Sequence, residues 1–137
     1  MEFCVSMKTI ELKRKVRWMD ADPAGRVYYP RIFDYAGECE AELLHSLGIL
    51  RKEFRGQFQF PRVHAECHIK KVMELDASFV IRFGPEKLGR SSIRYKFEIF
   101  LDDDPDHAAA YGSVTVVTVQ NGKPAPIPPQ IRVAFEG

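Results

Sequence analysis

A carboxylate and the expected start of a helix stand eight residues apart in the segment from Trp18 to Pro30. Asp22 lies in a loop punctuated by Pro23 and Gly25, and proline is common at the first position of a helix. A helix N-terminus presents unpaired backbone N–H groups and the positive end of the macrodipole, so it stabilises nearby negative charge. A carboxylate that can attack or deprotonate water, beside donors for an oxyanion, is half of an acyl-transfer site.

Two elements flank this loop and must position it. Residues 8–18 alternate between apolar and polar side chains, which predicts a half-buried strand with Trp18 on its apolar face. From Pro30 the apolar period becomes helical, and Gly48 suits the residue just past a helix end. The predicted helix has about five turns. Its apolar stripe consists of Ile32, Tyr35, Ala36, Cys39, Leu43 and Leu47.

The rest of the chain is typical of strands. Residues 49–60 predict an irregular or short helical segment, and the candidate strands that follow are 61–71, 77–84, 90–101 and 109–119. Asn121-Gly122 predicts a turn, and the prolines between 124 and 129 predict a stiff, non-sheet approach to the C-terminus. Without alternating helices a doubly wound parallel sheet is excluded. The order predicts one α+β domain over residues 1–137, an antiparallel sheet wrapped around one long central helix.

Composition excludes several classes of function. The 137 residues carry a net charge of +1, so bulk attraction to nucleic acid or to an anionic membrane is not expected. No apolar run is long enough for a membrane span. Cys4, Cys39 and Cys67 form no C-x-x-C pair, which argues against a disulfide framework or a structural zinc site. This cysteine usage fits a reducing cytoplasm, and the start of the chain has no basic region followed by an apolar run, as a signal peptide would, so we predict a cytoplasmic protein.

The run Asp20-Ala-Asp-Pro-Ala-Gly-Arg-Val-Tyr-Tyr-Pro30 resembles the motif of the hotdog-fold acyl-CoA thioesterases, specifically the 4-hydroxybenzoyl-CoA thioesterase family. The family motif reads approximately D-x-D-P-A-G-[hydrophobic]-V-[aromatic]-Y-P, and Arg26 is the one departure from it. Weaker likeness extends through residues 65–67, 89–93 and 122–128. The resemblance therefore covers nearly the whole domain and implies a hotdog fold.

The resemblance implies hydrolysis of an acyl-CoA thioester without a metal or an organic cofactor. Asp22 would be the catalytic carboxylate, as nucleophile or as general base, and the backbone N–H of Tyr29 would hold the thioester carbonyl. Pro30 has no N–H, so the donor must come from Tyr29 or from residues after Pro30. An alternative reading of Asp22 is a turn aspartate that caps its own loop. Asp20, the rival carboxylate, suits a structural role.

Six further residues are candidates for catalysis or substrate binding beside Asp22. Gly25 suits a positive φ or a close backbone approach, and Tyr28 and Tyr29 could line an acyl pocket or pack in the core. Lys87 and Arg90 could bind the phosphates of coenzyme A, with Ser91 as a hydroxyl donor, because related proteins contact coenzyme A in this region. The alternative for this cluster is a solvated strand end.

Other residues argue against a metal site and against two related activities. His64, Glu66 and His68 alternate on one strand face, but they lack a third imidazole or a P-C-x-x-C partner, so no metal site is predicted. We expect a polar strand face there, at a subunit contact or near the acyl pocket. Gly37 stands where aromatic-acyl members of the family place a carboxylate, which weakens 4-hydroxybenzoyl-CoA as the substrate. Val27 stands where hotdog hydratases carry a histidine, which argues against hydratase chemistry.

A lone sheet wrapped on one helix would expose a sheet edge, so we predict a homo-oligomer, a dimer or a homotetramer, with the site at the interface between subunits. Two alternatives stay open at this point. One is a hotdog module that binds acyl-CoA or acyl-carrier protein without turnover. The other is a thioesterase that acts on acyl-carrier protein rather than on coenzyme A.

Overall fold

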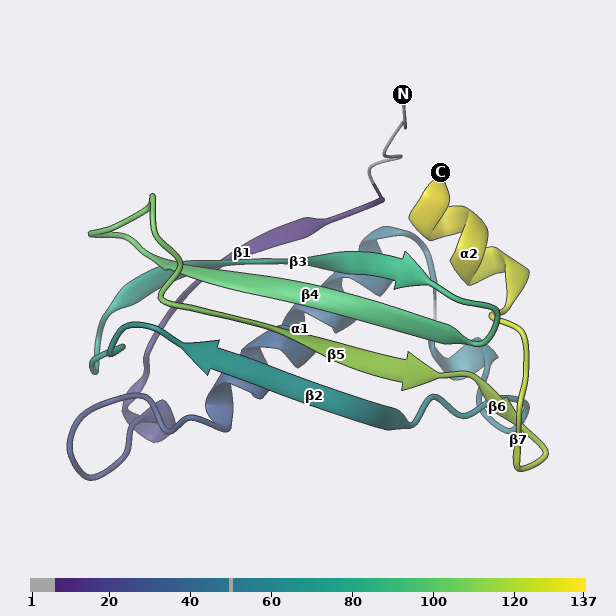
Figure 1. The fold of residues 1–137 in the computed structure, drawn as a ribbon, viewed down its shortest axis with the longest axis horizontal. Helices are drawn as coiled ribbons and strands as arrows, with labels where there is room; N and C mark the ends of the chain where they lie inside the picture. The colour runs from purple at the N-terminus through teal and green to yellow at the C-terminus, as the bar shows by residue number, and fades with distance from the viewer. Residues whose placement is uncertain (1–6, 50) are drawn as a thin grey trace.

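The computed structural model describes residues 7–49 and 51–137, and it is a curved antiparallel sheet with a long helix lying across one face (Figure 1). The strand order is β1-β3-β4-β5-β2, and every neighbouring pair is antiparallel. The five strands are β1 (Ile10–Lys15), β2 (Arg62–Ile69), β3 (Ser78–Leu88), β4 (Ser92–Leu101) and β5 (Ala110–Val117). The predicted α+β class is confirmed.

The long helix α1 spans Arg31–Ser46, as its apolar period predicts. Pro30 precedes it with helical dihedrals, φ −63° and ψ −21°, because the proline ring already fixes φ near the helical value. Gly48 ends the helix with a φ of +75°, and the N–H of Ile49 donates to the carbonyl of Leu44 at 2.9 Å. Five of the six predicted stripe residues are buried: Ile32, Tyr35, Ala36, Cys39 and Leu43.

The core lies between α1 and the inner face of the sheet. Ile81 on β3 pairs with Ile99 on β4, and Phe83 pairs with Phe97, so these four side chains point to the same side and are all buried. On the next strand Gly112 stands opposite Phe97. A Cβ at Gly112 would lie 2.1 Å from the carbonyl oxygen of Glu66 on β2 and 2.8 Å from the Phe97 ring. Only glycine therefore allows the edge strand to pack this closely.

The N-terminal strand is shorter than predicted, and the placement of Trp18 on its apolar face is wrong. β1 ends at Lys15, and Trp18–Asp20 form a short 3-10 helix, η1, in which the Trp18 side chain is 84% exposed. Alternation alone does not reveal where a strand ends. The buried position next to the strand is Val16, whose N–H donates to the carbonyl of Ala77 at 2.9 Å and closes the pairing with β3.

The C-terminal segment also differs from the prediction. The turn at Asn121 and Gly122 is confirmed, with φ values of +54° and +75°, but it joins two short strands, β6 (Val119–Gln120) and β7 (Lys123–Pro124). The chain then forms a second helix, α2 (Pro129–Glu136), so α1 is not the lone helix. Ile131 and Phe135 lie four residues apart on one face of α2 and are buried, and this packing stabilises a helix that the prolines obscure.

The remaining predictions concern linkers and cysteines. The irregular 49–60 segment contains one 3-10 turn, η2 (Arg51–Glu53). Cys39 is buried and Cys67 is half-buried, and both are free thiols, whereas Cys4 and the N-terminal segment used to predict a cytoplasmic location lie outside the described residues. Within residues 7–49 and 51–137, none of the helices combines the length and the apolar character needed to cross a membrane.

Candidate active site

The Asp22 carboxylate is fixed by its own loop. Its Oδ1 accepts hydrogen bonds from the N–H of Ala24 at 2.9 Å and of Arg26 at 3.2 Å. The N–H of Gly25 donates to the Asp22 carbonyl at 2.9 Å, and the positive φ of Gly25, +81°, turns the chain back so that the N–H of Asp22 donates to the carbonyl of Arg26 at 2.7 Å. Asp22 thus caps the loop with one oxygen. Its Oδ2 accepts no hydrogen bond from the described residues and is the atom available for chemistry.

The loop is in turn fastened to the segment that precedes β3. The N–H of Val27 donates to the carbonyl of Met73 at 2.7 Å, and the N–H of Leu75 donates to the carbonyl of Gly25 at 2.9 Å. Arg26 and Glu74 form an isolated antiparallel bridge between the two segments. Backbone hydrogen bonds therefore hold the Asp22 loop from both sides.

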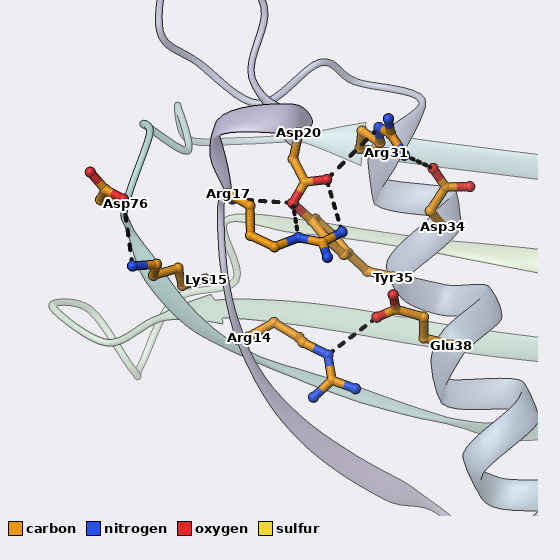
Figure 2. A network of polar contacts seen from close by, with 9 residues as sticks. All are labelled: Arg14, Lys15, Arg17, Asp20, Arg31, Asp34, Tyr35, Glu38 and Asp76. Atoms are coloured by element: carbon orange, nitrogen blue, oxygen red, sulfur yellow. Dashed lines mark hydrogen bonds and ion pairs between the residues drawn. The ribbon is translucent and has the colours of Figure 1, made fainter.

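Asp20 is fully buried and anchors the base of the loop (Figure 2). Its carboxylate accepts hydrogen bonds from the Arg17 N–H at 3.1 Å, from Arg17 Nε at 3.0 Å and from the Tyr35 hydroxyl at 3.0 Å, and it lies 3.8 Å from Arg31 Nε. Burial alone would raise the pKa of Asp20, but the hydrogen bonds from Arg17 and Tyr35 outweigh it and hold the pKa below its usual value. Asp20 is therefore structural, and most of its donors are side chains rather than loop amides.

The backbone N–H of Tyr29, which is the predicted oxyanion donor, makes no hydrogen bond among the described residues. The preceding N–H, that of Tyr28, donates to the carbonyl of Asp20 at 2.7 Å, and the following residue, Pro30, has no N–H. The next three amides donate in 3-10 fashion to the carbonyls of residues 28, 29 and 30, and they belong to Arg31, Ile32 and Phe33. Among the described residues the Tyr29 N–H finds no acceptor, so it is the free donor at this helix end.

The tyrosine side chains of the motif are exposed. Tyr28 and Tyr29 are 52% and 64% exposed, and their rings meet edge to face with centroids 5.8 Å apart. The alternative that one ring packs in the core is wrong, because the backbone bond from Tyr28 to Asp20 directs the chain along the surface. Exposed aromatic side chains of this size are typical of a surface that contacts a ligand or a partner.

A hollow of about 190 Å³ lies beside the middle of α1. Gly37 leaves one wall open, since a Cβ there would meet nothing within 4 Å. At the far end Glu40, which is buried, forms a bidentate ion pair with Arg62 of β2, with 2.9 Å between Arg62 Nη1 and Glu40 Oε2. The remaining lining is apolar or aromatic: Phe33, Ala36, Ala65, Phe83, Tyr95 and Val114.

A second hollow of about 330 Å³ continues beyond that ion pair. It lies between the C-terminal half of α1 and the 49–60 segment, and three phenylalanines line it: Phe54, Phe58 and Phe60. Glu40, Arg62 and Tyr95 line both hollows, so the ion pair stands at the boundary between them. Glu40 and Arg62 are not among the site residues predicted from the sequence. For Glu40 a signal was present, because it stands four residues after Ala36 and three before Leu43, on the buried face.

The predicted coenzyme A cluster does not meet Asp22 within one chain. Lys87 lies near the end of β3, and Arg90 and Ser91 lie in the turn to β4, where their carbonyls accept the N–H groups of Ile127 and Thr118. The Asp22 loop leaves the sheet at the opposite end, where Lys15 pairs with Ser78 (Figure 1). The length of β3, about 33 Å, separates the two ends.

The polar face of β2 is an ion-pair cluster on the outer side of the sheet. Glu66 accepts a hydrogen bond from the Ser113 hydroxyl at 3.0 Å, and the imidazoles of His64 and His68 lie 3.8 and 3.6 Å from its carboxylate. The Ser113 hydrogen bond and the two imidazoles lower the pKa of Glu66. In the part of the chain that the structure describes, no group of three or more His, Cys, Asp or Glu side chains is arranged to hold a metal ion.

Comparison with known proteins places this geometry in a family. A model of the thioesterase-like superfamily matches residues 16–135. A 1,4-dihydroxy-2-naphthoyl-CoA hydrolase of Nostoc punctiforme is 30% identical over 88 residues, which are 63% of this chain and 60% of that protein.

Solved structures agree on the fold. A 1,4-dihydroxy-2-naphthoyl-CoA thioesterase from Synechocystis superposes with a TM-score of 0.86 at 21% identity, covering 93% of this chain and 95% of that one. A gentisyl-coenzyme A thioesterase superposes with a TM-score of 0.79 at 26% identity, covering 93% and 100%. The predicted hotdog fold is confirmed, whereas the narrower 4-hydroxybenzoyl-CoA branch stays a prediction.

Proposed function

Because the chain belongs to the thioesterase-like superfamily, we propose that it hydrolyses an acyl-CoA thioester to a free acid and coenzyme A, with Asp22 and the Tyr29 N–H as the reacting groups. The observation that carries this proposal is that one stretch of eight residues, Asp22 to Tyr29, holds both a carboxylate oxygen and a backbone N–H without a hydrogen-bond partner among the described residues. Asp22 keeps Oδ2 free while Oδ1 is held by Ala24 and Arg26, and the Tyr29 N–H has no acceptor among the described residues.

The two groups suit the two tasks of thioester hydrolysis: the Asp22 carboxylate can activate water or attack, and the Tyr29 N–H can stabilise the oxyanion. In the general-base route, Asp22 takes a proton from water, the water oxygen bonds to the carbonyl carbon, and the Tyr29 N–H stabilises the oxyanion. The oxyanion then collapses, the C–S bond breaks, and the proton passes from Asp22 to the thiolate. In the nucleophilic route Asp22 itself attacks the carbonyl carbon, the C–S bond breaks and coenzyme A leaves as its thiolate. Water then hydrolyses the mixed anhydride, which frees the acid and the Asp22 carboxylate, and a proton from that water passes to the thiolate. The same two groups serve both routes.

A second copy of the chain completes the proposed site. Lys87, Arg90 and Ser91 lie at the end of the sheet opposite to Asp22, so a single coenzyme A can meet both only if they come from different subunits. Among the residues that the structure describes, the edge strand β2 pairs only with β5, and Val63 and Ile69 on it are exposed. An unpaired edge with exposed apolar side chains is a surface that another chain can cover. We therefore propose a homo-oligomer, a dimer or a tetramer.

Free-thiol release from a panel of aromatic and aliphatic acyl-CoA thioesters tests the proposal. The wild type should release thiol, and Asp22→Asn should lower kcat by at least about a hundredfold, because the amide neither attacks nor takes a proton. Asp34→Asn is the matched control: it is an exposed aspartate one turn into α1, and it should retain the wild-type rate.

Three outcomes separate the alternatives. Equal rates for the wild type and Asp22→Asn would refute the catalytic role of Asp22. Turnover of acyl-carrier protein thioesters alone would move the substrate from coenzyme A to the carrier protein. Tight binding of every thioester without thiol release would identify a binding module instead of an enzyme.

A further inference from the structure

We infer that the ion pair between Glu40 and Arg62 is the floor of the acyl pocket and selects acyl groups that carry a hydroxyl at their far end. This inference deepens the proposed function and rests on it, because it takes the Tyr29 N–H as the point where the thioester carbonyl is held. The acyl group then lies along α1, in the hollow of about 190 Å³ that Glu40 and Arg62 close.

The positions along α1 between the proposed carbonyl site and this floor share one face of the helix. Tyr29, Phe33, Gly37 and Glu40 follow one another at spacings of four, four and three residues, which places them on one face of the helix. Phe33, Gly37 and Glu40 all line the hollow. An acyl group that enters beside Tyr29 passes the phenylalanine, crosses the open space above Gly37 and meets the Glu40 carboxylate.

The spacing of these positions sets the length of acyl group that we expect. Eleven residues separate Tyr29 from Glu40, which is about 16 Å along the axis. Helical side chains lean toward the N-terminus, so the Glu40 carboxylate lies over the preceding turn. The space left is on the order of 10 Å. Two fused aromatic rings fit that length, and the apolar side chains of Phe83 and Val114 suit their faces.

The chemistry of the floor calls for a hydroxyl rather than a methyl or a bare ring edge. Arg62 uses two N–H groups on Glu40, and a guanidinium has five, so further donors can reach a ligand oxygen. A carboxylate accepts up to about four hydrogen bonds, so Glu40 can also accept the hydroxyl proton. A ring that ends in C–H would desolvate this pair without replacing its hydrogen bonds, which is costly for a buried ion pair.

The test compares 6-hydroxy-2-naphthoyl-CoA with 2-naphthoyl-CoA, which differ only in the distal hydroxyl. The wild type should prefer the hydroxylated thioester by at least about tenfold in kcat/KM. The double variant Glu40→Leu/Arg62→Met replaces the pair with apolar side chains of similar size, which a buried ion pair often tolerates. This variant should bring the preference to within about twofold of one, since a pocket without the pair has no hydrogen bonds to offer.

The control is a second ion pair of α1 that lines neither hollow. Arg14 of β1 and Glu38 of α1 lie 3.2 Å apart between the strand and the helix, so Arg14→Met/Glu38→Leu should keep the wild-type preference (Figure 2). A ratio measured on one preparation does not depend on its active fraction. If the double variant does not fold, Arg62→Lys keeps the charge but loses the bidentate geometry, and it should lower the preference at least about threefold.

Binding separates this inference from the proposed function. Calorimetric titration of both thioesters into Asp22→Asn, with and without the double change, reports the hydroxyl preference as a ratio of Kd values even when nothing is hydrolysed. A Kd ratio that falls with the pair supports the inference whatever the rates show. A wild type without preference, or a preference that survives in Glu40→Leu/Arg62→Met, overturns it, and it does so even where Asp22 proves catalytic.

Discussion

The hydroxyl of Tyr35, in the second turn of α1, donates a 3.0 Å hydrogen bond to the buried carboxylate of Asp20, two residues ahead of Asp22 (Figure 2). The carbonyl of the same Asp20 accepts the N–H of Tyr28 at 2.7 Å. Asp20 thus joins the loop to the helix through its side chain. Its backbone carbonyl also accepts the N–H of Tyr28, the neighbour of the Tyr29 donor. Burial and this hydrogen bond raise the pKa of Tyr35, so its hydroxyl remains a donor.

Tyr35→Phe should remove the hydrogen bond to Asp20 and leave no cavity in the core, because the ring stays packed against Phe79 with centroids 4.8 Å apart. A hydrogen bond to a charged group contributes about 1.5–3 kcal/mol, so the free energy of unfolding in urea should fall by that amount. The rate of thiol release should fall through kcat more than through KM, since Asp22 is displaced rather than removed. Tyr111→Phe, on the outer face of the sheet, is the control, and equal urea midpoints for both variants would contradict the role of Tyr35.

Acid should destabilise the protein through Asp20. Its pKa is lowered in the folded state, so its contribution is fully present above the unfolded pKa of about 4 and is lost as pH falls through the lower folded pKa. Asp20→Asn should cost about 3 kcal/mol at pH 7, because Arg17 and Tyr35 lose a charged acceptor in a buried place. Urea unfolding at several pH values measures this difference. It should narrow below about pH 4, and a constant gap would contradict the linkage.

Alanine substitution at Gly25 and at Gly37 should change the stability of the protein in opposite directions. Gly25 has a φ of +81° and Gly37 is helical, and a Cβ at either would meet nothing within 4 Å. Gly25→Ala should therefore cost about 1 kcal/mol of backbone strain and reduce thiol release, because the loop around Asp22 must change. Gly37→Ala should stabilise the protein by up to about 1 kcal/mol, as expected in a helix interior. Thermal unfolding of the two variants measures this: the Tm should fall for Gly25→Ala and rise for Gly37→Ala.

Gly112→Ala should be among the most destabilising alanine substitutions in the sheet. The new Cβ would lie 2.1 Å from the Glu66 carbonyl oxygen, so β2 must move away from β5. Overpacking of a rigid contact costs about 1–3 kcal/mol, and backbone cannot yield as a side-chain tip can. Chemical denaturation should show a loss at the upper end of this range. A loss below about 0.5 kcal/mol would mean that the two strands are not packed as closely as described.

Removing the Glu40–Arg62 pair should lengthen the accepted acyl chain. The pair separates the hollow of about 190 Å³ from the apolar hollow of about 330 Å³ beside Phe54 and Phe58. In Glu40→Leu/Arg62→Met the ratio of kcat/KM for tetradecanoyl-CoA over octanoyl-CoA should rise at least about tenfold, because additional methylene groups enter an apolar space. A ratio that stays within about twofold of the wild type would mean that the two hollows do not join.

Local patterns in the sequence determined the elements around Asp22. The helical period, Pro30 and Gly48 predict α1 to within one residue at its start, because a proline and a left-handed glycine fix the dihedrals of the ends themselves. Gly25 was likewise predictable, since a tight loop around an aspartate needs a residue that tolerates positive φ. These features depend on a few consecutive residues, and the family motif adds the expected chemistry to them.

Only the tertiary structure decided the features that join distant segments. Glu40 and Arg62 form an ion pair although they stand 22 residues apart in the sequence, and nothing in the sequence near either residue indicates its partner. Helix α2 is stable because Ile131 and Phe135 reach the core, not because its proline-flanked sequence favours a helix. The separation of Lys87 from Asp22 follows from the direction of β3 in the sheet. Burial and pairing of this kind depend on long-range packing, so local dihedral preference does not encode them.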